Sequence, residues 1–107
     1  MKIVLAIVGQ NDAGVVMDAL TEERFQVTKL ATTGGFLKAG NTTLLTGVED
    51  EKVSKVIDII SKYSSKRSQV MAGALPMDMD AQIIPPIEVT VGGATIFVLD
   101  VDRYEKV

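Results

Sequence analysis

Residues 2–8 form an almost unbroken run of β-branched and aliphatic side chains, KIVLAIV. Successive side chains on a strand point to opposite faces, so a run without polar interruptions predicts a central strand that is covered on both faces. Helices packed on one side leave the other face of such a sheet still to be buried. Self-association is the simplest way to bury it, and we therefore expect a homo-oligomer.

Two segments have the apolar spacing of amphipathic helices. In the first, Asn11 or Asp12 is expected to cap the helix start, and in the second we expect Asp50 to do so. The apolar residues that recur at helical spacing are Ala13, Val16, Met17 and Leu20 in the first segment and Val53, Val56, Ile57 and Ile60 in the second.

Four further segments are predicted to be strands, at residues 25–30, 42–48, 87–91 and 95–101. The connection between the first two is too short for a parallel crossover, so they should pair antiparallel. Gly92 and Gly93 are expected to turn a closing hairpin between the last two.

Residues 64–86 contain all three prolines and no sustained periodicity, which predicts a long connection. The element order is then that of a ferredoxin-like βαββαβ unit with an added C-terminal strand. We expect a single α+β domain over residues 1–107, with both helices on one face of the sheet.

The chain of 107 residues contains no histidine and no cysteine. Their absence excludes histidine-based catalytic triads, imidazole or thiolate metal sites and disulfides. The net charge of −3 gives no support to DNA or RNA binding through phosphate neutralisation. The first apolar run is too short for membrane insertion, and the lack of cysteine suits a reducing compartment. We expect a cytoplasmic protein that is not an enzyme and has no catalytic residues, cofactor or bound metal.

Residues 29–45, KLATTGGFLKAGNTTLL, carry more hydrogen-bonding groups than a hairpin connection requires. Gly34 and Gly35 permit a close backbone approach, and Phe36 with Leu37 offers an apolar surface on which a nucleobase can stack. From composition alone two interpretations stay open. One is a nucleotide-binding loop, and the other is a long hairpin in which the threonines express strand propensity and Phe36 packs on its neighbours.

That stretch, together with GVED at 47–50 and VGGATIFVLDVD at 91–102, resembles the PII-like cyclic di-AMP receptor family. These are small trimeric signalling proteins related to the nitrogen-regulatory PII proteins, and the resemblance covers nearly the whole chain. It implies a ferredoxin-like homotrimer with ligand held in clefts between adjacent subunits. It also implies loops, at about 33–40 and 65–86, that move on binding and relay the signal to a downstream protein, which the sequence does not identify.

By the same resemblance, six residues match positions that line the family's ligand pocket: Thr28, Gly35, Phe36, Leu37, Asn41 and Gly47. The resemblance implies hydrogen bonds from the side chains of Thr28 and Asn41. It implies backbone contacts at the two glycines, and the Phe–Leu pair covering one adenine.

The sequence departs from the family's pattern at the pocket rim. Receptors of the family commonly carry asparagine at the position of Arg24 and arginine at the position of Gln26. A glutamine cannot neutralise a phosphate, so Arg24 is a candidate to replace that charge, two residues earlier on the same strand face. Both are candidate rim residues. The family's Met-Gly-Gly stretch is replaced by residues 77–80, MDMD, and its aromatic, glutamine-containing tail by residues 102–107.

An alternative is therefore a PII-like trimer that has lost cyclic di-AMP binding and senses another nucleotide, an anion or a metal. For a metal, Asp78 and Asp80 would have to supply oxygen ligands. A small acyl-phosphate hydrolase on the same scaffold would need an arginine in its first loop, and the sequence GQNDAG contains none.

Overall fold

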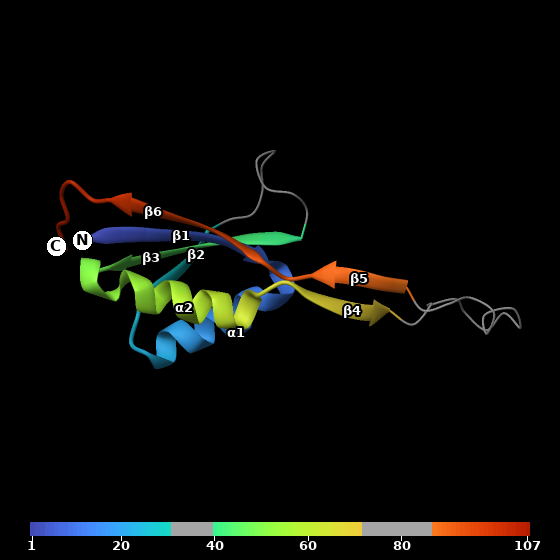
Figure 1. The fold of residues 1–107 in the computed structure, drawn as a ribbon. Helices are drawn as coiled ribbons and strands as arrows, with labels where there is room; N and C mark the ends of the chain where they lie inside the picture. Colours follow the sequence, from blue (N-terminus) through green and yellow to red (C-terminus); the bar gives the residue numbers. More distant parts are fainter. Residues whose placement is uncertain (31–39, 72–86) are drawn as a thin grey trace, which may run out of the picture.

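The computed structural model describes residues 1–30, 40–71 and 87–107 (Figure 1). Along the chain it places, in order, the elements β1 (Lys2–Gly9), α1 (Gln10–Glu22), β2 (Val27–Leu30), β3 (Asn41–Val48), a 3₁₀ turn (Asp50–Lys52), α2 (Val53–Ser64), β4 (Arg67–Met71), β5 (Ile87–Val91) and β6 (Ala94–Asp100).

The main sheet has the strand order β2-β3-β1-β6, and all its neighbouring strands are antiparallel. β1 therefore lies between two other strands, as its apolar run predicts. Two helices on a four-stranded antiparallel sheet in this order give the ferredoxin-like arrangement, so the predicted fold class is confirmed.

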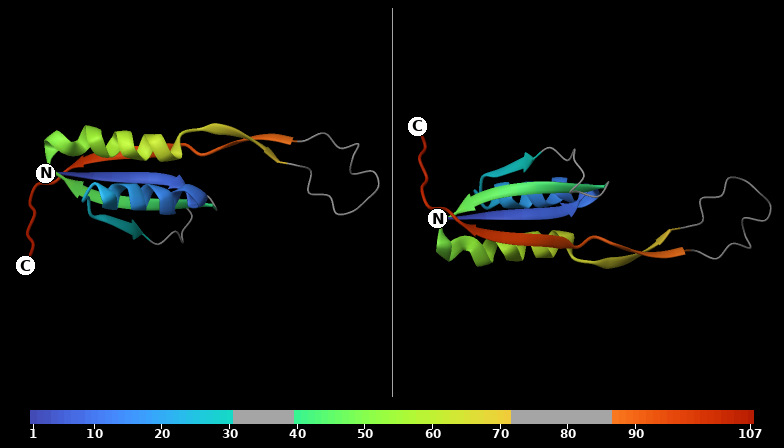
Figure 2. Two further views of the ribbon diagram at one scale, coloured as in Figure 1. Left: turned by 90° about the horizontal axis from the view of Figure 1, so that it is seen from below. Right: turned by 90° about the horizontal axis from the view of Figure 1, so that it is seen from above.

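Both helices pack on one face of the sheet, as Figures 1 and 2 show. The core between the layers joins alternate residues of β1 to one stripe of each helix. Its members include Val4, Ala6 and Val8 from β1, Val16 and Leu20 from α1, and Val56 and Ile60 from α2, each at most 1 % exposed. The predicted apolar stripes are thus the faces that bind the helices to the sheet.

The capping predictions are wrong for both helices. α1 begins at Gln10 after Gly9, whose extended backbone starts the helix without a side-chain cap. Asp12 lies within the first turn, and its carboxylate accepts hydrogen bonds from Arg67 instead. Asp50 lies in the 3₁₀ turn ahead of α2 and pairs with the Met1 amino group at 2.8 Å. In each case the carboxylate expected to cap the helix instead forms an ion pair with a cation that is distant in sequence.

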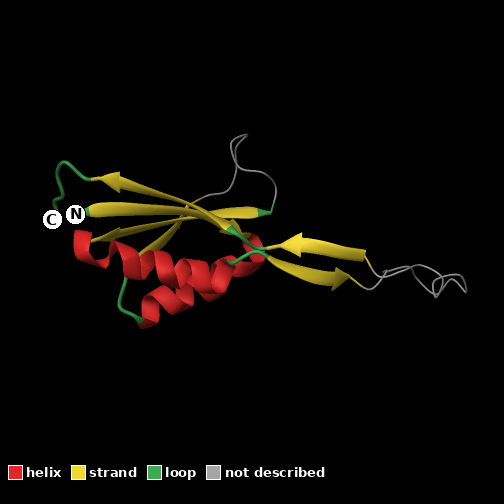
Figure 3. Cartoon of the chain, in the orientation of Figure 1, coloured by secondary structure: helices red, strands yellow, loops and turns green. Residues whose placement is uncertain are grey.

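The prediction of a closing hairpin is also wrong. β6 pairs with β1, whereas β5 pairs with β4 in a separate two-stranded sheet that extends from the main body (Figure 3). We call this β4–β5 ribbon the arm. Gly92 and Gly93 join the two sheets rather than turning one strand back on the other. The strand expected as a C-terminal addition is therefore the fourth strand of the main sheet, and the extra strands precede it.

The long connection predicted over residues 64–86 contains β4, which sequence periodicity does not reveal. The segment RSQVM has no alternation of polar and apolar residues that would predict a strand. The rest of that connection, at residues 72–86, lies outside the described residues.

Candidate functional site

The face of the main sheet opposite the helices is largely apolar. Directly paired residues of antiparallel strands share a face, so the register groups Ile3, Leu5 and Ile7 of β1 with Thr28 and Leu30 of β2, Thr43, Leu45 and Gly47 of β3, and Thr95, Phe97 and Leu99 of β6. We call this set the open face. Phe97 and Leu99 are each 47 % exposed, which is unusual for large apolar side chains on a central sheet.

One end of the open face contains a pocket of about 240 Å³, which we call the Gln26 pocket. Three of the residues singled out from the sequence, Gln26, Thr28 and Gly47, line it together. Gly47 leaves space there: a Cβ built on it would lie 3.5 Å from the Met1 methyl carbon, an ordinary contact distance. The pocket thus combines a hydroxyl, an amide and an open stretch of backbone.

Tyr104 also lines the Gln26 pocket, and the sequence analysis did not select it. The residue is 60 % exposed, so a ligand can reach it. A phenol ring offers both a stacking surface and a hydrogen-bonding hydroxyl. The signal that could have identified it is the single aromatic residue in a charged C-terminal segment, DRYEKV.

Arg24 lies beside this pocket, but not on β2 as expected. α1 ends in a Schellman motif: the Phe25 N–H donates to the Leu20 carbonyl and the Arg24 N–H to the Thr21 carbonyl, each at 2.9 Å. Phe25 and Leu20 are both buried, as the motif's apolar contact requires. Arg24 therefore adopts a left-handed conformation with φ of 67°, and β2 starts only at Val27.

Arg24 lines a second pocket of about 380 Å³, which shares Gln26, Gly47 and Met1 with the first. Lys52 lines it as well, and within the described part of the chain neither cation has a carboxylate within ion-pair distance. Glu23, at the same rim, is paired with Lys55 at 2.8 Å, and that hydrogen bond lowers the pKa of the Glu23 carboxyl. Glu49 lines the same pocket and likewise has no ion-pair partner among the described residues, so Arg24 and Lys52 leave one excess positive charge next to the Gln26 pocket.

Asn41 lies at the opposite end of β3. It lies six positions before Gly47, which corresponds to about 20 Å along a strand. It lines another hollow of about 260 Å³ together with Lys66 and the Gly92–Gly93 junction. Within one chain the structure therefore brings Thr28, Gln26 and Gly47 together and places Asn41 apart from them.

Three of the predicted ligand residues, Gly35, Phe36 and Leu37, lie outside the described residues, as do Asp78 and Asp80. In the parts that are described, no three acidic side chains gather as a metal site would require. The described helices are all too short or too polar to cross a membrane.

Comparisons with known proteins found matches over nearly the whole chain. A family model described as cyclic-di-AMP receptor matches residues 1–107. The structure is also similar to the crystal structure of a functionally unknown protein from Pediococcus pentosaceus, with a TM-score of 0.79 and 43 % sequence identity. That match covers 99 % of this chain and 96 % of the other.

Proposed function

The chain belongs to the cyclic-di-AMP receptor family, and from that premise we propose that it binds cyclic di-AMP at the Gln26 pocket. The observation that carries the proposal is the convergence of Thr28, Gln26 and Gly47 on one pocket of the open face. Thr28 offers a hydroxyl to a ribose or phosphate oxygen, and Tyr104 offers a ring against which an adenine stacks.

We propose further that the cleft is completed by a neighbouring copy in a homotrimer. The Gln26 pocket, at about 240 Å³, is smaller than the roughly 300–1,000 Å³ of pockets that enclose drug-sized ligands. A cyclic dinucleotide with two adenines therefore needs a second wall. The exposed apolar side chains beside the pocket, Phe97 and Leu99, supply the surface on which another copy would pack.

In this proposal Arg24 provides the positive charge that Gln26 lacks. A left-handed conformation costs a non-glycine residue roughly 1–2 kcal/mol, so keeping arginine at φ of 67° is a structural disadvantage. Asparagine tolerates this conformation better. Arg24→Asn is thus expected to raise the melting temperature and, if the guanidinium holds a ligand phosphate, to weaken binding about tenfold. Unchanged affinity with a raised melting temperature would leave Arg24 with no ligand role.

Isothermal titration calorimetry with cyclic di-AMP, with ATP and cyclic di-GMP as controls, tests the proposal directly. We expect saturable, selective binding near one ligand per subunit. Thr28→Val, which removes one neutral hydrogen bond, should weaken it by about 2- to 12-fold. Ser54→Ala is the matched control, because it removes an exposed hydroxyl from α2. It should leave the affinity for cyclic di-AMP unchanged.

A second variant fills the pocket instead of removing a contact. Gly47→Val adds a branched side chain whose Cβ meets the end of the Met1 side chain at an ordinary contact distance, and valine favours strand structure, so the fold should be little affected. Binding should fall by well over tenfold because the side chain occupies the ligand's volume. Wild-type binding in Gly47→Val would place the ligand elsewhere.

The protein is proposed to act without catalysis, in the cytoplasm, as a sensor whose ligand-bound form is read by a downstream protein. Failure of wild-type protein to bind cyclic di-AMP at high micromolar concentration would overturn the assignment of this ligand. It would favour the alternative of a trimer that senses another nucleotide or anion through Arg24 and Lys52.

A further inference from the structure

Two turns form the larger pocket beside the Gln26 pocket, which we call the Arg24 pocket. Its volume is about 380 Å³. The turn after α1 supplies Arg24, and the 3₁₀ turn before α2 supplies Lys52, whose N–H donates to the Glu49 carbonyl at 2.9 Å. Each turn adjoins a buried side chain, Phe25 in the first case and Val48 in the second. The charged groups of the Arg24 pocket are therefore carried by backbone that the core holds in place.

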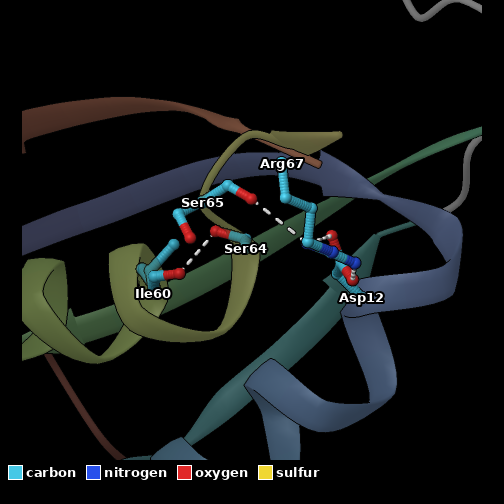
Figure 4. Close-up of polar contacts among 5 residues, drawn as sticks. All are labelled: Asp12, Ile60, Ser64, Ser65 and Arg67. Atoms are coloured by element: carbon cyan, nitrogen blue, oxygen red, sulfur yellow. Dashed lines mark hydrogen bonds and ion pairs between the residues drawn. The ribbon is translucent and has the colours of Figure 1, made fainter. Parts of the chain in front are cut away.

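Arg24 occupies a position that does not suit an arginine. Its left-handed backbone, with φ of 67°, is unfavourable for a residue that has a Cβ atom. The other two arginines of the chain each hold a carboxylate: Arg67 pairs with Asp12 (Figure 4) and Arg103 with Glu105. Arg24 has no such partner among residues 1–30, 40–71 and 87–107. The contacts of the described chain thus give no reason for a guanidinium here.

Lys52 is unfavourably placed as well. It immediately precedes α2, where the positive end of the helix dipole disfavours a cation. It also lacks a carboxylate within ion-pair distance in the described parts of the chain. Residues that oppose local structural preferences persist mainly at functional sites. Two such cations on one pocket are what an anionic ligand requires.

The charge of the Arg24 pocket is unbalanced by one. Glu23 is paired with Lys55 and the Met1 amino group with Asp50, each at 2.8 Å. Against the two cations there remains Glu49, which has no ion-pair partner among the described residues. A phosphodiester group carries one negative charge, so a single such group would neutralise the excess.

The Arg24 pocket adjoins the Gln26 pocket directly, because Met1, Gln26 and Gly47 line both. Gly47 has no side chain, so a ligand can pass close to the backbone between them. A base that stacks on Tyr104 in the Gln26 pocket therefore has a path along which its ribose and phosphate extend toward Arg24.

We propose that the Arg24 pocket is a phosphate subsite of the ligand cleft, in which Arg24 and Lys52 bind one phosphodiester group and Glu49 weakens that binding. This rests on the proposed function, because a base in the Gln26 pocket sets where the phosphate lies. Arg24 offers a planar fork of donors to two phosphate oxygens, and Lys52 offers a compact charge. The positive charge that Gln26 cannot supply then comes from two turns at the end of the sheet.

Isothermal titration calorimetry with cyclic di-AMP at an ionic strength of about 0.15 M tests the subsite. Lys52→Gln should weaken binding by about 3- to 10-fold, because it removes a charge-assisted contact to the phosphate. Glu49→Gln should tighten binding by about 2- to 5-fold, because it removes a like charge.

Lys62→Gln is the matched control. It makes the same change of net charge as Lys52→Gln, but near the far end of α2, about 15 Å along the helix. Charges that far apart are largely screened at this ionic strength, so the affinity should stay within about twofold of wild type.

Melting temperatures show whether the fold is affected. Lys52 and Glu49 are both exposed, so neither substitution should lower the melting temperature. Lys52→Gln should raise it slightly, because it removes a cation from the start of α2. Changes of affinity in opposite directions cannot both result from partial unfolding.

Two results would overturn the subsite. If Lys52→Gln and Lys62→Gln weaken binding equally, affinity follows net charge and Lys52 does not contact the phosphate. If Glu49→Gln leaves binding unchanged or weaker, Glu49 does not face the phosphate.

A comparison of adenosine with adenosine 5′-monophosphate tests the subsite separately from the proposed function. In NMR titrations the unmodified protein should bind the monophosphate at least about threefold more tightly than the nucleoside. The difference should disappear when Arg24→Asn is combined with Lys52→Gln. Absence of cyclic di-AMP binding to the unmodified protein would overturn the proposed function, and this comparison would still decide the subsite. Equal affinity for the two compounds would overturn the subsite even if cyclic di-AMP binds.

Discussion

Phe97→Asp tests the packing of a second copy on the open face. Phe97 is 47 % exposed in the single chain. An aromatic side chain buries about 150–250 Å² when fully covered, so roughly 70–120 Å² of Phe97 remains available in each protomer. At about 25 cal/mol per Å² this contributes about 2–3 kcal/mol per protomer, and about 5–9 kcal/mol per trimer. An aspartate at this position would lose that contribution and add the cost of burying a charge.

The assay is sedimentation velocity or light scattering across a concentration series. The chain concentration at which half of a trimer has dissociated scales with the square root of the dissociation constant. Phe97→Asp should therefore raise that concentration by about 50-fold or more. Val98→Asp is a matched control, because Val98 is the next residue of β6, is 44 % exposed and points to the opposite face of the sheet.

Two results would refute this reasoning. A Phe97→Asp protein that stays trimeric at the wild-type midpoint would show that Phe97 is not in an interface between copies. An equal effect of Val98→Asp would show that the change acts through the stability of β6 instead. A wild-type protein that is monomeric at micromolar concentration would overturn the trimer itself.

Three further variants test the packing and charge of the main body. Leu20→Ala removes a side chain with no exposed surface and should lower the free energy of unfolding by about 2–5 kcal/mol in urea titrations; a loss below 1 kcal/mol would contradict the packing described here. Gly92→Ala should cost about 1–3 kcal/mol, because the added methyl group meets the Ser65 carbonyl at a residue with φ of 84°; amide hydrogen exchange in the arm and urea titration would both detect it. Glu23 has a pKa lowered below its usual 4.5 by the hydrogen bond from Lys55, so its stabilisation is present above pH 4.5 and lost as the pH falls through the lowered value. Glu23→Gln should therefore make the free energy of unfolding depend less on pH below 4.5. An unchanged dependence on pH in that range would show that the Glu23–Lys55 pair does not contribute to stability.

The sequence predicted those elements that are defined by their own periodicity. The apolar run of β1, the stripes of α1 and α2 and the antiparallel pairing of β2 with β3 all follow from side-chain spacing and loop length. For the site, sequence resemblance selected Thr28, Gln26 and Gly47, which the fold then places in one pocket. The ligand roles given to them remain predictions.

The sequence did not predict features that depend on contacts between distant segments. Nothing local to Asp12 or Asp50 indicates that Arg67 and the Met1 amino group would take their carboxylates. Similarly, the sequence pattern puts Arg24 on the same strand face as Gln26, whereas it ends α1 in a left-handed conformation. Glycine usually marks such a helix end, and arginine at this position gives no such signal.

The layered body follows from apolar spacing along the chain, because burying apolar side chains at fixed helical or strand spacing allows few arrangements of these elements. How the chain leaves that body depends on contacts between distant segments. Gly92 and Gly93 can serve a tight turn or a junction equally well, and β6 pairs with β1 because its apolar run completes the main sheet. β5 is then left to pair with β4, and the buried Asp12 carboxylate sets where that arm begins.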